Sequence, residues 1–171
     1  MKKVFCLFLV LLMCCFLFAC DPGHRSIERE ELNDVVSVEL IQYNNPNQKH
    51  FSSWIPDQFG RLVPFDNTKS NVLETLPTEK MDVFLDELSE ISFLDKYYAY
   101  DSPNDVCIKL NYNNGDFLIL WANYAQNRYS GYIGKYSSNG DVLSFLGSFY
   151  SLDHYTDLID QFFNYNLSVN Q

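Results

Sequence analysis

Two Asn-Gly dipeptides constrain the fold of this chain more than any other feature of its sequence. Asn114-Gly115 and Asn139-Gly140 each lie between segments rich in β-branched and aromatic residues. A two-residue Asn-Gly loop is a strong hairpin signal, because both loop positions favour positive φ angles. Two hairpins are therefore expected in succession, which makes a four-stranded antiparallel meander.

The loops also predict which residues face each other across the strands. Because side chains alternate between the two faces of a strand, the loop fixes which residues share a face. In the first hairpin, the predicted pairs are Tyr112 with Phe117, Leu110 with Ile119 and Ile108 with Trp121. In the second, they are Tyr136 with Leu143, Gly134 with Phe145, Tyr132 with Gly147 and Ile133 with Leu146.

Two further segments have the apolar period of amphipathic helices. The first runs from Thr78, its expected N-cap, to Leu94, with apolar residues at Met81, Phe84, Leu85, Leu88 and Ile91. The second begins at Ser151 and has apolar residues at Tyr155, Leu158, Ile159 and Phe162. A strand is expected over Val35 to Tyr43. The predicted fold is a single α+β domain, a mostly antiparallel sheet with both helices packed on one face.

The first twenty residues have the order of a secretory signal. Lys2 and Lys3 precede an apolar stretch at positions 4–19, and Ala19 stands directly before Cys20. The segment Leu17-Phe18-Ala19-Cys20 resembles the lipobox of bacterial lipoproteins. The resemblance implies that Cys20 is lipidated and becomes the new N-terminus. It also implies that the protein is held by palmitate-type chains on the extracytoplasmic side of a bacterial cell membrane.

Two other interpretations of this segment remain open. An uncleaved membrane anchor needs about 20 apolar residues, and positions 4–19 supply sixteen. A secreted protein cut after Ala19 without lipidation is the second alternative.

The expected organisation has four parts. Residues 1–19 form the signal peptide, 20–33 the lipidated N-terminus and an acidic tether, 34–165 the globular domain and 166–171 a polar tail. Without Lys2 and Lys3, ten basic and 22 acidic residues remain, a net charge of −12. That charge repels phosphate backbones, so nucleic acid is not an expected partner.

The sequence contains no recognisable catalytic or metal-binding motif. Once the signal and Cys20 are set aside, Cys107 is the single remaining cysteine, which excludes an internal disulfide and a CxxC zinc motif. Cys107 lies in a predicted strand, and His154 lies near the start of a predicted helix, so a nucleophile–base pair is not expected. No metal, cofactor or catalytic residue is predicted.

Tyrosine is concentrated in one part of the chain. Eight of the twelve tyrosines lie between positions 97 and 136. A band of exposed tyrosines can recognise sugars or proteins, so Tyr129, Tyr132 and Tyr136 form a tentative binding face. The alternative is that these rings pair across the strands within the sheet.

These observations favour a membrane-anchored lipoprotein that binds an envelope protein or a glycan and has no catalytic activity. The alternative is a hydrolase that acts on the cell envelope. Such an enzyme would need two carboxyl groups close together in a concave site, and sequence spacing does not reveal such a pair.

Overall fold

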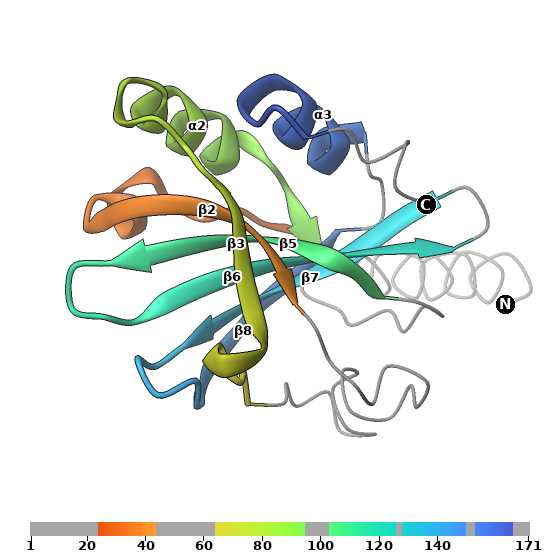
Figure 1. Ribbon diagram of the computed structural model, residues 1–171. Coiled ribbons are helices and arrows are strands. Elements are labelled where there is room, and N and C mark those ends of the chain that lie inside the picture. Colours follow the sequence, from red (N-terminus) through yellow and green to blue (C-terminus); the bar gives the residue numbers. More distant parts are fainter. Residues whose placement is uncertain (1–23, 44–63, 95–102, 126–127, 150–152, 166–171) are drawn as a thin grey trace, which may run out of the picture.

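The computed structural model describes residues 24–43, 64–94, 103–125, 128–149 and 153–165 (Figure 1). Cys20, Ser151 and the tail at 166–171 lie outside the described residues. The strands are β1 (His24–Arg25), β2 (Val35–Tyr43), β3 (Ser70–Thr75), β4 (Phe93–Leu94), β5 (Pro103–Tyr112), β6 (Phe117–Ala125), β7 (Arg128–Tyr136) and β8 (Val142–Phe149). The helices are η1 (Arg29–Leu32), η3 (Asn67–Lys69), α2 (Thr78–Glu90) and α3 (Asp153–Phe162).

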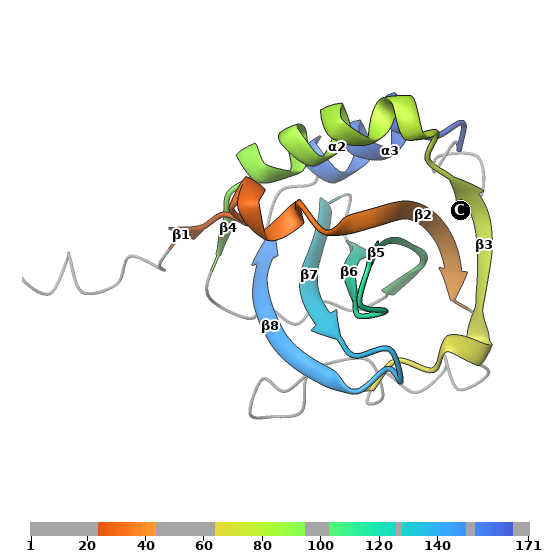
Figure 2. The ribbon, with the colours of Figure 1, turned by 90° about the vertical axis from the view of Figure 1, so that its left-hand side faces the viewer.

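The strands form one antiparallel sheet. Among the described residues its order is β1-β4-β8-β7-β6-β5-β2-β3, eight strands, of which β1 and β4 have two residues each. Helices α2 and α3 lie on the same side of this sheet (Figures 1 and 2). The prediction of a mostly antiparallel sheet with helices against it is confirmed. Among the described residues, no helix is both long enough and apolar enough to cross a bilayer.

The sheet separates two apolar cores, because both faces of its central strands are buried. On the helix side, strand residues such as Val38, Leu40, Ile108, Leu110, Leu118 and Leu120 pack with apolar residues of α2 and α3, and we call this cluster the helix-side core. On the opposite side lies a cluster that we call the inner core, formed by Ile41, Tyr43, Phe65, Cys107, Phe117, Ile119, Trp121 and Tyr136.

The predicted register of β5 and β6 is wrong by one residue. Phe117 lies opposite Asn111 instead of Tyr112, and Trp121 lies opposite Cys107 instead of Ile108. The two-residue loop is wrong as well. The amide of Gly115 donates to the carbonyl of Tyr112, and the amide of Tyr112 donates to the carbonyl of Asp116. This pattern belongs to a three-residue loop in which glycine has the left-handed conformation.

A loop of the same kind connects β7 and β8. The amide of Gly140 donates to the carbonyl of Ser137, and that of Ser137 donates to the carbonyl of Asp141. Two shifts in register follow along this strand pair. Gly134 therefore lies opposite Phe145 as predicted. The other pairs are shifted, and Tyr136 lies opposite Val142 instead of Leu143.

The first predicted helix is shorter than its apolar period suggested. Pro77 stands at the N-cap position and Thr78 is already helical. Ile91 has an extended backbone with φ −74° and ψ 126°. The chain then enters β4, where Leu94 pairs with Ser148 of β8. Phe93 and Leu94 are therefore strand residues, because pairing to the sheet replaces the last predicted turn of the helix.

The predicted tether at 20–33 is wrong for its second part. His24 and Arg25 pair with Leu94 and Phe93, and Ile27 and Leu32 are 3% and 0% exposed in the helix-side core. Burial of such a side chain contributes roughly 1.5–3 kcal/mol. The two large apolar residues of this segment therefore hold it against the domain.

The sheet curls away from the helices, and the segment before β3 closes the open side of the inner core (Figure 2). The amide of Phe65 donates to the carbonyl of Gly140 at 2.8 Å, and the side-chain amide of Asn67 donates to the carbonyl of Ser138 at 3.4 Å. The ring of Phe65 lies 5.3 Å from that of Phe117. The backbone contact at Gly140 thus fixes Phe65 over the inner core.

Alanine substitutions at the two loop glycines test this contact. Gly115 and Gly140 have nearly equal φ angles, 87° and 88°. A Cβ atom at Gly140 would lie 1.9 Å from the carbonyl oxygen of Phe65, whereas one at Gly115 would meet only the Cβ atom of Ser138 at 3.3 Å. We expect Gly115→Ala to lower the free energy of unfolding by about 1–2 kcal/mol. Gly140→Ala should cost about 3 kcal/mol or more, since the backbone must also move.

Urea unfolding of both variants and of the parent protein measures the difference. Gly115→Ala is the matched control for the conformational cost. Equal losses in the two variants would contradict the placement of Phe65 against Gly140.

Candidate functional site

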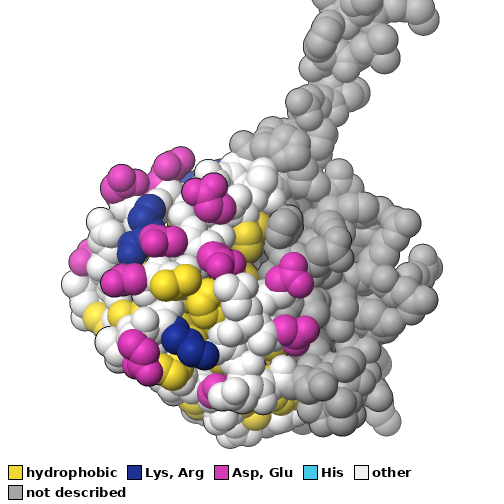
Figure 3. Space-filling view, turned by 90° about the horizontal axis from the view of Figure 1, so that it is seen from above, with side chains coloured by type: hydrophobic (Ala, Val, Ile, Leu, Met, Phe, Trp, Pro, Cys, Tyr) yellow, Lys and Arg dark blue, Asp and Glu magenta, His cyan; other side chains and the backbone are white. Residues whose placement is uncertain are grey.

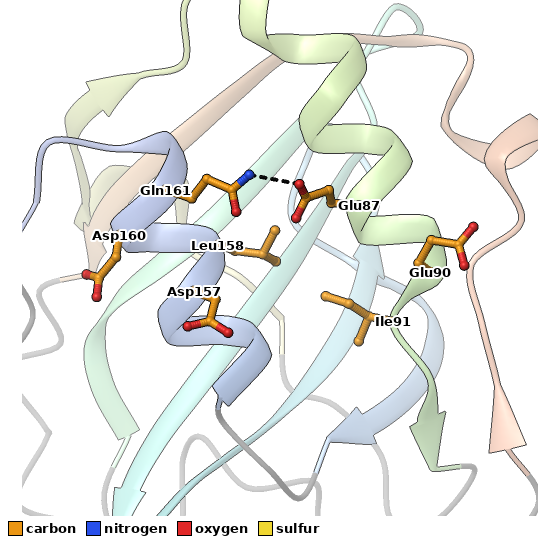
Figure 4. Close-up of a pocket in the computed structure, with 7 residues that line it drawn as sticks. All are labelled: Glu87, Glu90, Ile91, Asp157, Leu158, Asp160 and Gln161. Carbon is orange, nitrogen blue, oxygen red and sulfur yellow. Dashed lines mark hydrogen bonds between the residues drawn. The ribbon is translucent and has the colours of Figure 1, made fainter.

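A groove of about 680 Å³ lies between α2 and α3 (Figure 4). Its lining residues are Glu87, Glu90, Ile91, Asp157, Leu158, Asp160 and Gln161. Glu87 and Glu90 are three residues apart on α2, and Asp157 and Asp160 are three apart on α3, so each pair lies on one side of its helix. We call these four side chains the groove carboxylates. Figure 4 shows Glu87 and Asp157 beside the groove, whereas the side chains of Glu90 and Asp160 point away from it. Ile91 and Leu158, which are 9% and 3% exposed, lie between the two helices.

Aromatic packing holds the two helices at this separation. The ring of Phe84 on α2 lies 5.2 Å from that of Phe162 on α3, and the two are nearly perpendicular at 87°. Phe163 contacts the same ring at 6.2 Å. These edge-to-face contacts belong to the helix-side core. The groove therefore lies directly above a buried, rigid part of the molecule.

Polar contacts fix the position of α3 further. The side-chain amide of Gln161 donates to the Glu87 carboxylate at 2.8 Å across the groove (Figure 4). Beyond the end of α3, the Glu74 carboxylate on β3 accepts from the backbone and side-chain nitrogens of Asn164 at 2.9 and 3.1 Å. Helix α3 is thus connected both to α2 and to the edge strand of the sheet.

The two sides of α2 differ in how their charges are compensated. Arg29 of η1 forms ion pairs with Asp86 at 2.7 Å and with Asp82 at 3.2 Å. Within the described part of the chain, no ion pair reaches the groove carboxylates. Arg29 therefore offsets one of the two negative charges of Asp82 and Asp86, while the groove carboxylates have no ion pair among the described residues. In Figure 3 the surface seen from above shows a hydrophobic patch with both acidic (Asp, Glu) and basic (Lys, Arg) side chains around it.

The groove is the place where a catalytic carboxyl pair would be sought. A general acid of that kind must be kept protonated by burial or by a neighbouring charge. All four groove carboxylates are exposed to solvent, so burial does not provide this environment. Nor do the described residues include a group of three His, Cys, Asp or Glu side chains placed to hold a metal ion.

The structure corrects the tentative tyrosine face. Tyr136 is 1% exposed in the inner core. Its ring stacks on Phe117 at 5.4 Å, and its hydroxyl accepts from the indole of Trp121 at 3.4 Å. Tyr136 therefore does not belong to an exposed face, because cross-strand aromatic packing covers it. The backbones of Tyr129 and Tyr132 lie in β7, and their side chains lie outside the described part.

Cys107 and Lys109 occupy structural positions. Cys107 is 0% exposed in the inner core, and the side chain of His154 is not among those described. Lys109 lies over the Phe117 ring at 4.3 Å and donates to the side-chain oxygen of Asn67 at 3.2 Å. Burial lowers the pKa of Lys109, and the nearby Glu39 carboxylate opposes this effect. These residues complete and close the inner core.

The ionisation of Tyr136 tests its burial directly. Burial raises the pKa of its hydroxyl, and the hydrogen bond from Trp121 only partly opposes this. Exposed tyrosines ionise near pH 10. We expect Tyr136→Phe to leave the tyrosinate absorbance that appears between about pH 9 and about pH 11 unchanged. The contrary result would be that Tyr136→Phe, with an unaltered circular dichroism spectrum, loses the tyrosinate absorbance of one tyrosine in this pH range. That loss would show that the Tyr136 hydroxyl faces solvent.

Comparisons with models of protein families, with curated proteins and with solved structures find no match to this chain. Fold does not by itself determine function, which depends on the chemistry of a site. The function must therefore be argued from the groove and from the N-terminal motif.

Proposed function

We propose that this protein is a lipid-anchored binding module of the bacterial cell envelope, without catalytic activity of its own. The observation that carries the binding function is the groove between α2 and α3, which is lined by acidic side chains and by the apolar Ile91 and Leu158. Ligand sites combine apolar surface with a few convergent polar groups in this way. The partner is an envelope protein or a glycan.

The anchor is the lipobox cysteine. In the family that Leu17 to Cys20 resembles, the cysteine thiol receives a diacylglyceryl group and the preceding peptide is removed. Each buried methylene contributes about 0.8 kcal/mol, and two acyl chains retain a protein that one would release. The resemblance also implies that the domain lies on the extracytoplasmic side of the membrane.

The anchor would hold the domain close to the membrane surface. Strand β1 begins at His24, so four residue steps separate it from Cys20. Fully extended, four residues span about 14 Å. The expected tether is therefore short, and the domain stays near the lipid to which Cys20 is attached.

A hydrolase that acts on the envelope remains the alternative function. It would need a carboxyl group that is kept protonated next to one that is ionised. The groove brings four carboxylates together, but their exposure to solvent favours recognition over acid–base chemistry.

Metabolic labelling tests the anchor. Cells that express the full chain with labelled palmitate should incorporate label into the protein, and Cys20→Ser should abolish it. Cys15→Ser is the matched control. It changes a nearby cysteine that is preceded by Cys14 instead of by a small residue, so that cysteine does not fit a lipobox. Label that persists in Cys20→Ser would overturn the anchor, and loss of label in Cys15→Ser would move it to another cysteine.

A further inference from the structure

The two Asn-Gly loops share one backbone geometry, so their asparagines can be compared directly. Gly115 and Gly140 have φ angles of 87° and 88°, and each glycine amide donates to the carbonyl of the residue three positions earlier. An asparagine before glycine is open to loss of its side-chain amide, because glycine has no side chain that hinders attack by its own backbone nitrogen. The loops differ in what restrains this attack.

The reaction joins two groups of neighbouring residues. The glycine nitrogen loses its proton and forms a bond to Cγ of the asparagine, the bond from Cγ to Nδ2 breaks, and Nδ2 takes up the proton and leaves as ammonia. The product is a cyclic imide. Water then adds to one of the two imide carbonyls, and opening of the ring gives aspartate or isoaspartate. In isoaspartate the backbone passes through the side chain.

In the first loop the side chain of Asn114 is held. Its Nδ2 atom donates to the Asp116 carboxylate at 3.0 Å, and its Oδ1 atom accepts from the Asp116 backbone amide at 2.9 Å. Attack on Cγ turns the planar amide into a tetrahedral centre, so it disturbs both hydrogen bonds. The restraint in this loop therefore acts on the group that is attacked.

In the second loop the side chain of Asn139 lacks this restraint. Asn139 is exposed, and among the described residues its side chain makes no hydrogen bond. The amide of Asp141 donates to the hydroxyl oxygen of Ser137 at 3.1 Å. Ser137 thus takes the backbone hydrogen bond that holds Asn114 in the first loop. Cγ of Asn139 is left open to attack.

The restraint on Asn139 acts on the backbone that follows it. Gly140 is buried, its carbonyl accepts from the amide of Phe65 at 2.8 Å, and its own amide donates to the carbonyl of Ser137 at 2.8 Å. To reach Cγ, the nitrogen of Gly140 must rotate about the preceding Cα–C bond, which carries its peptide group away from both partners. Gly115, in contrast, is exposed. The contact with Phe65 therefore controls the attacking group at Asn139.

We propose that Asn139 is a site of spontaneous conversion to aspartate and isoaspartate, and that the contact between Phe65 and Gly140 sets its rate. Conversion takes place when the segment that carries Phe65 lifts from the loop. Isoaspartate lengthens the backbone of the loop, so the two residues no longer meet as before. The Phe65 ring lies 4.7 Å from that of Tyr43 and 5.8 Å from that of Trp121. Conversion thus turns a transient opening of the inner core into a lasting one.

Isoaspartate mapping of the full chain tests this proposal. The protein is incubated at mildly alkaline pH, which favours the deprotonated amide, and mass spectrometry of its digest measures conversion at Asn139 and Asn114. Synthetic peptides of residues 110–119 and 135–144 give the rate of each site without the fold. We expect Asn139 to convert in the folded protein, more slowly than in its peptide.

Two variants separate the restraints of the two loops. Phe65→Leu weakens the packing over the second loop and should raise the rate at Asn139 by about ten-fold, which corresponds to about 1.4 kcal/mol in the free energy of opening. The rate at Asn114 should not change. Asp116→Ala removes one hydrogen bond of the Asn114 side chain and should raise the rate there by about five-fold. It should leave Asn139 unchanged.

A third, exposed variant guards against poor folding of Phe65→Leu. Asn67→Ala removes the side-chain donor to the carbonyl of Ser138 at 3.4 Å, beside the same contact. It should raise the rate at Asn139 by about two-fold. Circular dichroism checks that each variant is folded.

The outcomes decide the proposal. No conversion at Asn139 in the parent protein would overturn it. Equal acceleration of both asparagines by Phe65→Leu and by Asn67→Ala would also overturn it, because general unfolding would then set the rate. The converted protein, separated by its additional negative charge, should unfold at a lower urea concentration than the parent. Equal unfolding midpoints would refute the effect on the inner core.

Discussion

Burial of both faces of β6 is the constraint on which the rest of this structure depends. Residues 117–121 are all apolar and are 0–3% exposed, so each face needs its own cover. Helices α2 and α3 cover one face. The curl of the sheet, closed by Phe65, covers the other. The groove exists because two helices, held together by Phe84, are needed to cover the first face.

The same property explains why the sequence predicted the strands but not their register. Alternation of polar and apolar residues identifies the buried face of a strand, and residues 117–121 do not alternate. A shift of one residue exchanges Phe117 and Leu118 between the two cores at little cost in burial. Asn-Gly is compatible with a two-residue loop and with a three-residue loop that ends in a left-handed glycine. Neither signal could therefore decide between the two registers.

The candidate site was hidden for a different reason. On each helix taken alone, Glu87 and Glu90, or Asp157 and Asp160, look like an ordinary solvated face. Their meeting depends on the packing of Phe84 against Phe162, a contact between residues far apart in the sequence. The apolar periods correctly indicated the buried stripes at Leu88 and Leu158. They could not indicate that Gln161 would donate to Glu87 across the two helices.

The segment before β2 changes the charge of the helix surface. Its apolar residues Ile27 and Leu32 dock it into the helix-side core, which brings Arg29 within reach of Asp82 and Asp86. Exposed ion pairs of this kind contribute little to stability, typically about 0–1 kcal/mol. Arg29 also offsets part of the negative charge on this side of α2.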